Sequence, residues 1–277
     1  MNKLKDAKYF NKLDFIWGHN NIWIKEGNKW KTAFLINKEL FKPKIMYFGL
    51  YNSSSIFQRM MNSIFQEILY EGVLVSYIND FVIPAKTKKE LEKRTIYFLK
   101  IVEKHNFCFK QSKCDFDVEE IPILGVVVGW GEVQIEKNKV KAVKKWKTPT
   151  KIKEVENFLL GFANFYWLFI KNFSYIAKPK NKIKGKSEWK WDNEHWKVFK
   201  ELKDKITSQP ILTLPKREER FRVETDALGY AIEEVLFQEQ EGKLKPITFL
   251  SRTMQLAERN YEIYNKELLA IVKALAK

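Results

Sequence analysis

Residues 73–85, VLVSYINDFVIPA, form an apolar run that is interrupted by a single polar pair, Asn79-Asp80. Apolar stretches on both sides of a short polar pair predict two β-strands joined by a tight turn. Such a hairpin is rigid and presents the side chains of its turn at one end. It can offer carboxylates to a metal ion, although only one of these two turn residues is an acid. The alternative interpretation is an ordinary solvated turn.

The segments before the hairpin predict strands and a helix. Residues 10–36 alternate apolar and polar side chains, which predicts strands with a hairpin turn at residues 27–28. Residues 52–70 predict a helix that Asn52 or Ser53 caps. The apolar stripe expected on this helix consists of Ile56, Met60, Ile64 and Ile68.

The segments after the hairpin continue the alternation of helix and strand. Residues 86–107 predict an amphipathic helix with lysines outside. The side chains expected inside are Leu91, Ile96, Leu99 and Val102. Residues 121–135 return to a strand pattern, so the first part of the chain predicts an α/β or α+β layer structure.

The second half of the chain predicts a helical unit and then another group of strands. Thr150 can cap a helix that has Glu154 and Glu156 in its first turns. Residues 187–208 predict a further helix. Strands return from Ile211 onward, and a final helix closes the sequence. We therefore predict three domains, which comprise residues 1–147, 148–210 and 211–277.

The charge balance favours a polyanionic partner. The 277 residues include 50 Lys and Arg against 34 Asp and Glu, a net charge of +16. Neutralised phosphates and released counterions would favour binding to nucleic acid. An anionic membrane surface or ribosome-like packing is the alternative.

Cysteine content and hydropathy predict an intracellular protein of the cytoplasm or nucleus that is not secreted. Cys108 and Cys114 form neither a disulfide framework nor a zinc pattern, so we expect reduced thiols. The N-terminus lacks an apolar signal core. No stretch approaches the roughly 18 apolar residues that a membrane span requires.

Several acids stand where predicted strands end. They are Asp14, Asp80 and Asp226, and Glu267 joins them from the final helix. Carboxylates at strand ends can hold two magnesium ions about 4 Å apart for in-line displacement at phosphorus. Any one of these acids taken alone is more simply a solvated side chain, so the interpretation depends on their order along the chain.

In that order, the segments resemble the reverse transcriptase of gypsy-type LTR retrotransposons, continuing into an RNase H-like domain. The polymerase motifs are KLDFIWGHNNIWIKEGNKWKTAF, MYFGLYNSSSIFQRMMNSIF, the Tyr-x-Asp-Asp-like YINDFVI, and ILGVVV at the primer grip. KKWKTPTKIKEVENFLLGFANFYWLFIKNFSYIAKP resembles the connecting segment. VETDALGYAIEEVL and NYEIYNKELLAIVKAL resemble the start of RNase H. The resemblance covers almost the whole chain.

The resemblance implies an α+β fold with a right-hand-type polymerase palm, a helical thumb or connection, and a truncated RNase H-like domain. The fingers are expected to be largely missing, because only thirteen residues precede Asp14. The implied partners are an RNA template, a DNA primer, their RNA–DNA hybrid and deoxynucleoside triphosphates, with no membrane. The implied cofactor is Mg²⁺, bound as a pair of ions.

The resemblance also assigns roles to single residues of the polymerase. Asp14, Asn79 and Asp80 take the positions of the metal-binding carboxylates, and the backbone carbonyl of Phe15 lies beside the second metal. Residues implied at the nucleotide are His19, Phe48 and Gly49. Residues implied elsewhere are Gln58 under the template, Lys113 as proton donor, and Asp226 and Glu267 as the first two RNase H acids.

Three residues depart from the family pattern. Asn79 replaces an aspartate, and its side chain offers one neutral oxygen instead of a charged pair, so we expect magnesium binding and catalysis to be badly weakened. His19 replaces an aromatic residue that selects the sugar. Glu233 replaces a glycine, and we expect a glutamate to fit poorly there.

Two further hypotheses stay open beside the impaired polymerase. One is a non-catalytic nucleic-acid-binding relic or co-opted protein, in which tryptophans stack on bases or else pack in the core. The tryptophans concerned are Trp146, Trp167, Trp189 and Trp191. The other is a translated pseudogene fragment that folds only marginally.

Overall fold

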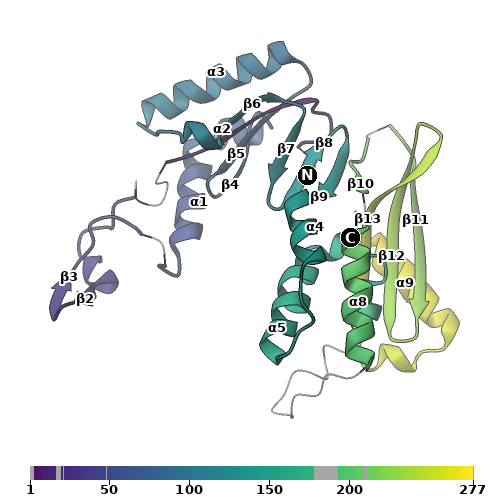
Figure 1. Ribbon diagram of the computed structural model, residues 1–277. Coiled ribbons are helices and arrows are strands. Elements are labelled where there is room, and N and C mark those ends of the chain that lie inside the picture. Colours follow the sequence, from purple (N-terminus) through teal and green to yellow (C-terminus); the bar gives the residue numbers. More distant parts are fainter. Residues whose placement is uncertain are drawn as a thin grey trace. The chain divides into compact units, whose positions relative to one another are not determined.

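The chain folds into an α+β protein, as the sequence predicts. The computed structural model describes residues 3–16, 20, 22–47, 49–177, 193–208, 211–216 and 218–276. They form two compact units, Lys3–Ile121 and Pro122–Lys277 (Figure 1). Within the part of the chain that the structure describes, no helix is long and apolar enough to cross a membrane.

The first unit is built on a four-stranded sheet in the order β4-β5-β1-β6 (Figure 1). Its strands are β1 (Tyr9–Asp14), β4 (Val75–Tyr77), β5 (Asp80–Ala85) and β6 (Asp115–Val118). A two-residue turn, Ile78-Asn79, joins β4 to β5, because Tyr77 and Asp80 are direct antiparallel partners. The hairpin predicted at residues 73–85 is therefore confirmed, but its turn lies one residue earlier than the predicted pair Asn79-Asp80, and Asp80 belongs to β5.

Helices cover one face of this sheet. They are α1 (Ser53–Ile64), α2 (Gln66–Tyr70) and α3 (Lys88–Lys104), and a 3-10 turn, η3 (Gln111–Lys113), precedes β6. Leu13 and Phe15 of the β1 segment and Phe81 of β5 pack against these helices in one buried cluster. Side chains alternate across a strand. The even-numbered positions, among them Asp14 and Asp80, therefore face the other side of the sheet.

The buried faces of the helices differ from the predicted stripes. In α1, Phe57 and Met61 are fully buried, and the expected residues Ile56, Met60 and Ile64 only pack partly against the core. The expectation for Ile68 is confirmed.

In α3, the predicted interior positions Ile96 and Leu99 are wrong, with exposures of 49% and 39%. Phe98 is buried instead, between Leu91 and Val102. Its ring centroid lies 5.1 Å from that of Phe65. Positions 91, 98 and 102 share one helical face, and a phenylalanine buries more area there than a leucine.

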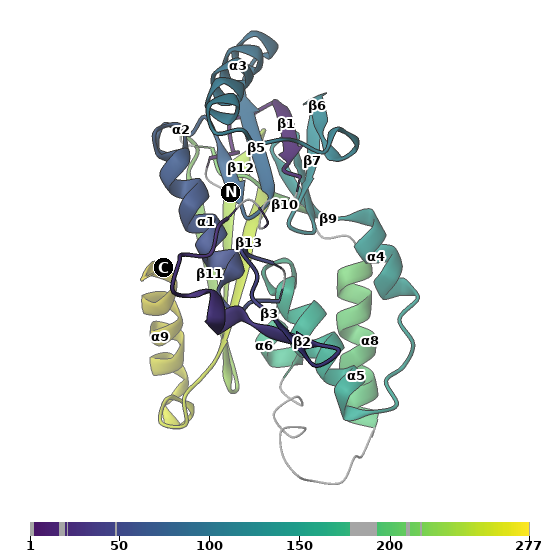
Figure 2. The ribbon, with the colours of Figure 1, turned by 90° about the vertical axis from the view of Figure 1, so that its left-hand side faces the viewer.

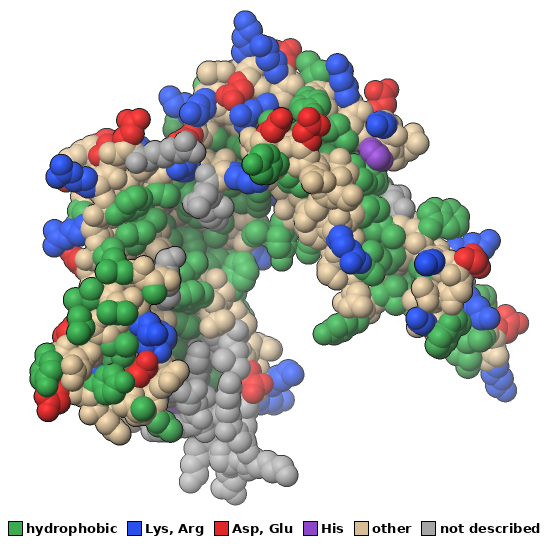
Figure 3. Space-filling view, turned by 180° about the vertical axis from the view of Figure 1, so that it is seen from behind, with side chains coloured by type: hydrophobic (Ala, Val, Ile, Leu, Met, Phe, Trp, Pro, Cys, Tyr) green, Lys and Arg blue, Asp and Glu red, His purple; other side chains and the backbone are tan. Residues whose placement is uncertain are grey.

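The predicted hairpin turn at residues 27–28 is also wrong. Residues Lys29–Thr32 form a 3-10 helix, η2, and the hairpin follows it as β2 (Phe34–Ile36) and β3 (Glu39–Phe41). The actual turn is Asn37-Lys38, with φ values of 49° and 70°. Both residues are left-handed, which is the geometry of a two-residue hairpin turn. Hydrophobic side chains of this hairpin lie on the surface in Figure 3, and Phe34 stacks on Phe41.

The second unit begins with a sheet in the order β10-β9-β8-β7. Its strands are β7 (Glu120–Ile123), which spans the boundary between the units, β8 (Val126–Gly129), β9 (Glu132–Ile135) and β10 (Ile211–Thr213). The sequence pattern of residues 121–135 therefore resolves into three strands. Gly125, in the turn between β7 and β8, has a φ of 78°.

Helices follow this sheet, as predicted for the middle of the chain. They are α4 (Lys137–Lys144), α5 (Ile152–Glu156), the π-helix η4 (Asn157–Ala163), the 3-10 turn η5 (Trp167–Phe169), α6 (Phe173–Ile176) and α8 (Asn193–Thr207). Figure 2 shows α8 beside α4 and α6, which it contacts.

The predicted helix cap at Thr150 and the tryptophans of this helical region have different outcomes. Thr150 does not accept a capping bond; its N–H and hydroxyl instead donate to Glu154 Oε2, at 2.8 and 3.1 Å. Trp146 packs at 5.2 Å from Phe158 and 5.7 Å from Phe162, which favours its core interpretation. Trp189 and Trp191 lie outside the described residues.

The unit ends in a three-stranded antiparallel sheet that a helix covers. Its elements are β11 (Phe221–Leu228), β12 (Ala231–Gln240), β13 (Lys243–Thr253), the 3-10 turn η6 (Glu258–Asn260) and α9 (Ile263–Leu275). Ala227 of β11 and Ile232 of β12 form a small buried cluster with Ala270 of α9. The strands and final helix predicted from residue 211 onward are confirmed.

Candidate active site

Two carboxylates stand side by side at the end of the first sheet. Asp14, the last residue of β1, is the direct antiparallel partner of Asp80, the first residue of β5. Directly opposed residues share one face of a sheet, with Cβ atoms about 5 Å apart. Their side chains are 18% and 29% exposed. The sheet thus presents both acids together on the face opposite the helices.

Each carboxylate has a lysine partner. Lys113 Nζ lies 3.3 Å from Asp14 Oδ2, and Lys12 Nζ lies 3.4 Å from Asp80 Oδ1. Lys12 precedes Asp14 by two residues on β1, so both side chains emerge on the same face. The structure brings Lys113 to Asp14 across 99 residues of sequence, as its implied place at the site requires. Lys12 was not singled out in the sequence, although its spacing from Asp14 is a usable signal.

The turn between the strands is fixed from α1. Ile78 has a φ of 53°, a conformation that β-branched residues rarely adopt. Its N–H donates to Gln58 Oε1 at 2.6 Å, and Gln58 Nε2 donates to Asn62 Oδ1 at 2.8 Å and to Ser76 Oγ at 3.3 Å. Gln58, implied to lie under the template, is therefore engaged in holding the hairpin turn in place.

Asn79 completes the end of the hairpin. Its Oδ1 is buried and has no hydrogen-bond partner. An unpaired buried oxygen costs free energy unless a ligand satisfies it. Asn79 directly precedes Asp80 in the chain, and amide and carboxylate oxygens such as those of Asn79, Asp14 and Asp80 are the kind of donor that Mg²⁺ prefers. These three residues fit a divalent cation, although no group of three acidic, histidine or cysteine side chains gathers among the described residues.

The other residues implied at the nucleotide are placed only in part. The Phe15 side chain is buried and stacks on Phe109 at 4.8 Å, so only its backbone is available to a ligand. Gly49 has a φ of 104°, which a residue with a side chain rarely adopts. His19 and Phe48 lie outside the described residues.

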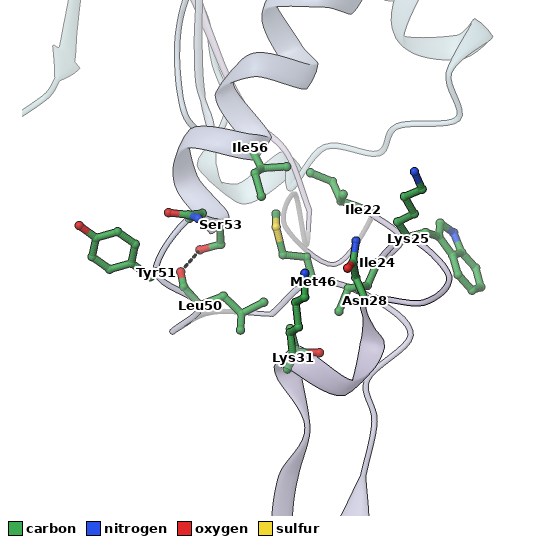
Figure 4. Close-up of a pocket in the computed structure, with 13 residues that line it drawn as sticks. Ile22, Ile24, Lys25, Asn28, Lys31, Met46, Leu50, Tyr51, Ser53 and Ile56 are labelled. Atoms are coloured by element: carbon green, nitrogen blue, oxygen red, sulfur yellow. Dashed lines mark hydrogen bonds between the residues drawn. The ribbon is translucent and has the colours of Figure 1, made fainter.

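A pocket of about 520 Å³ lies between residues 22–32 and the start of α1. Ile22, Met46 and Ile56 converge on its apolar interior, whereas Tyr51 points away (Figure 4). Lys25 and Lys31 contribute positive charge to the lining. The pocket could not be predicted from the sequence, because its walls come from two segments, residues 22–32 and 46–56, and the periodicity of each segment says nothing about contact with the other.

In the second unit, the implied RNase H acids occupy different environments. Asp226 on β11 is exposed and is the antiparallel partner of Glu233 on β12, and Glu267 on α9 is half-buried. Ala227, not Asp226, joins the buried cluster under α9. The assignment of Asp226 and Glu267 as metal ligands stays a prediction.

Glu233 is accommodated in the fold, contrary to expectation, although its Oε1 is buried without a hydrogen-bond partner. It is 4% exposed, and its Oε2 accepts a hydrogen bond of 2.8 Å from the N–H of Asn172. Burial, and secondarily the nearby carboxylate of Asp226, raise the pKa of Glu233 to about 7, whereas the Asn172 N–H opposes this rise. The glutamate is accommodated because the segment after η5 supplies a hydrogen-bond donor.

Comparison with known proteins identifies the two regions. Residues 1–128 match the family model for reverse transcriptase (RNA-dependent DNA polymerase), and residues 191–277 match that for the RNase H-like domain found in reverse transcriptase. The chain carries a reverse transcriptase domain followed by an RNase H-like domain. Both are of the kind found in retrotransposon Pol polyproteins.

The relatives of this reverse transcriptase are retrotransposon polyproteins. The chain is 36% identical over 278 residues to the retrovirus-related Pol polyprotein from transposon 297 of Drosophila melanogaster, with 99% of the chain and 26% of that protein covered. It is 33% identical to the gypsy Pol polyprotein of the same organism, covering 99% of the chain and 27% of the polyprotein. The chain thus spans about a quarter of the length of these relatives.

Solved structures confirm the polymerase-type fold. The foamy viral protease-reverse transcriptase in complex with RNA/DNA hybrid superimposes with a TM-score of 0.83 at 22% identity, covering 99% of this chain and 38% of that one. The same viral protein in complex with dsDNA gives 0.82 at 22% identity, covering 100% of this chain and 58% of that one. Reverse transcriptase and RNase H-like domains generally use divalent metal ions.

Proposed function

We propose that this chain is an RNA-directed DNA polymerase that binds a template–primer duplex but transfers nucleotides slowly because Asn79 replaces an acid. The observation that supports the proposal is the pairing of Asp14 and Asp80 at one end of the sheet, together with the buried, unpartnered oxygen of Asn79, the residue before Asp80. Its partners are then an RNA template, a DNA primer and deoxynucleoside triphosphates.

In this mechanism, the residues of the hairpin bind and orient the reacting groups. A bound pair of magnesium ions supplies positive charge that lowers the pKa of the primer 3′-hydroxyl and stabilises charge on the α-phosphate. Asp14 and Asp80 would hold these ions, with the Phe15 carbonyl as a further oxygen. We assign Lys113, whose Nζ lies beside Asp14, the role of giving a proton to the leaving pyrophosphate. Gly49 leaves room for the nucleotide.

The cost of Asn79 follows from the missing charge. Two unit charges 4 Å apart interact by about 4 kcal/mol at an effective dielectric constant of 20. A neutral amide oxygen loses most of this attraction to a cation. At about 1.4 kcal/mol for each factor of ten, the transfer step is expected to slow by roughly 10²- to 10³-fold.

Primer extension tests the proposal. The full chain, Asn79→Asp and Asn106→Asp are compared with magnesium, an RNA template and a DNA primer. Asn106 is exposed beyond the end of α3, so its substitution adds the same charge away from the site. We expect Asn79→Asp to extend the primer roughly 10²- to 10³-fold faster than the wild type, with no gain for Asn106→Asp. Equal rates for the wild type and Asn79→Asp would refute the role given to Asn79.

The second candidate function is nucleic-acid binding without catalysis. The net charge of +16 favours it, because phosphate neutralisation by lysines needs no metal. Retention of an RNA–DNA hybrid by Asn79→Asp without any extension would support this candidate. Absence of hybrid binding at low salt would exclude both functions.

The domain division of the proposal follows the sequence. We assign residues 1–147 to the palm, 148–210 to a helical connection or thumb, and 211–277 to the RNase H-like domain. In that last domain, Asp226 and Glu267 are proposed as the first two acids of a ribonuclease site.

A further inference from the structure

Lys12 is a charged residue of the site to which the mechanism above gives no role. It lies between acids on both neighbouring strands: its Nζ is 3.4 Å from Asp80 Oδ1 on β5, and Asp115 on β6 is its antiparallel partner. Its side chain is only 16% exposed. The aliphatic stem is therefore fixed against the sheet, and the ammonium group is held beside the carboxylate of Asp80.

Each of the two candidate metal-binding acids has a lysine counter-ion, and Asp115, opposite Lys12 on β6, adds a third acid to this part of the sheet. Asp14 and Asp80 contribute two negative charges, and Lys113 and Lys12 contribute two positive ones. An aspartate at position 79 would add a third negative charge, but asparagine adds none. A dication that approaches these oxygens therefore competes with an ammonium group for each carboxylate.

The ion pairs of the two lysines differ in how easily they break. The Lys113 side chain is 55% exposed, so water screens its ion pair and its flexible stem can turn into solvent. Lys12 is largely shielded and emerges from the same strand as Asp14. Water and salt screen the attraction within a shielded ion pair less than within an exposed one, so the ammonium group of Lys12 stays bound to Asp80 more strongly. Lys12 is therefore the stronger competitor for a cation.

We propose that Lys12 is an internal counter-ion that competes with divalent cations for Asp80 and sets the cation affinity of this site. The inference rests on the proposed function, because it takes Asp14 and Asp80 as the cation-binding acids. Lys12 acts as a positioning residue: it holds Asp80 in place without a cation and must move when a cation binds.

Binding of Mn²⁺ alone to the full chain, followed by the electron paramagnetic resonance signal of the free ion, tests the proposal without nucleic acid. The variants are Lys12→Gln, Lys12→Met, which keeps the aliphatic stem, and Lys12→Arg, which keeps the charge. Lys86→Gln is the matched control, since it removes a charge from an exposed pair with Asp6 at 4.0 Å. Circular dichroism confirms that each variant is folded.

We expect Lys12→Gln and Lys12→Met to bind Mn²⁺ about tenfold more tightly than the wild type, a difference of about 1.4 kcal/mol. Lys12→Arg should restore the wild-type affinity, and Lys86→Gln should stay within about twofold of it. Adding Asp80→Asn to Lys12→Gln should abolish the gain. This pattern separates competition at Asp80 from a general effect of net charge.

Three results would overturn the inference. Unchanged or weaker Mn²⁺ binding in both Lys12→Gln and Lys12→Met would mean that the lysine supports the site instead of competing for it. A gain that persists with Asp80→Asn would place the ion elsewhere. No saturable binding in any variant would show that Lys12 does not limit affinity. If Mn²⁺ binding follows the expected pattern but Asn79→Asp does not extend a primer, the proposed function alone is refuted.

Discussion

Replacing Glu233 by glutamine is expected to stabilise the protein above neutral pH and to have little effect in acid. The carboxylate is 4% exposed on β12, and only Oε2 has a donor, the N–H of Asn172. Oε1 is buried without a hydrogen-bond partner. Burial raises the pKa of Glu233, helped by the Asp226 carboxylate and opposed by the Asn172 N–H, Lys171 and Lys205.

The size of the effect follows from the difference between the two states. The pKa of Glu233 is about 7 in the folded protein, against 4.5 for an ordinary glutamate. Between these values the folded state keeps a proton that the unfolded state has lost, so the free energy of unfolding falls as pH rises. The contribution is fully present below pH 4.5 and is lost above about 7. At about 1.4 kcal/mol per pH unit, it is at most ~3.5 kcal/mol.

Glutamine keeps the acceptor for Asn172 and carries no charge, so it resembles the protonated glutamate at every pH. Thermal melts of wild type and Glu233→Gln at pH 5 and pH 8 measure the effect, with Glu239→Gln as an exposed control on the same strand. We expect the melting temperature of Glu233→Gln to exceed that of wild type at pH 8 and to approach it at pH 5. A difference that is independent of pH, or a destabilised variant at pH 8, contradicts the reasoning.

Two further substitutions test packing inside each unit, and urea unfolding measures the change in stability for both. Gly125→Ala should destabilise the protein by roughly 1–3 kcal/mol, because φ is 78° and the added Cβ would lie 2.7 Å from the Tyr166 hydroxyl oxygen; combining it with Tyr166→Phe should recover part of the loss, and no recovery would assign the cost to the backbone alone. Asn11→Ala should cost roughly 2–4 kcal/mol, because Asn11 donates to Thr95 Oγ1 at 2.8 Å and accepts from the Asp117 N–H at 2.7 Å; a loss below 1 kcal/mol would show that water replaces both bonds.

Local chemistry made the β4–β5 hairpin predictable. The apolar runs on either side of Asn79-Asp80 are long enough for two strands and are separated by only two residues. The helix over residues 88–104 was equally visible from its spacing of apolar positions. Its inward face was misjudged because Phe98 and Leu99 are adjacent and both apolar. Contact with Phe65 and Phe81, which come from other elements, decides that Phe98 is buried.

The candidate site was likewise predictable from the sequence only in part. Asp14, Asp80 and Lys113 could be singled out from the sequence, but nothing in it places Lys12 on Asp80 or Gln58 on the N–H of Ile78. The turn at Asn37-Lys38 was missed because Gly27-Asn28 is the stronger turn signal in the sequence. In the structure a 3-10 helix follows Gly27-Asn28, and the hairpin begins only after that helix. Glu233 was misjudged because its donor comes from a segment 61 residues away.

The sequence by itself determined which segments become strands and helices, and it placed an uncharged residue at the end of the β4–β5 hairpin, because these properties depend on neighbouring residues. The tertiary structure alone decided that Asp14 faces Asp80, that each of these acids has a lysine partner, and that burial raises the pKa of Glu233. Those outcomes depend on strand register and burial, which bring together charges far apart in the chain and remove the water that would otherwise screen them.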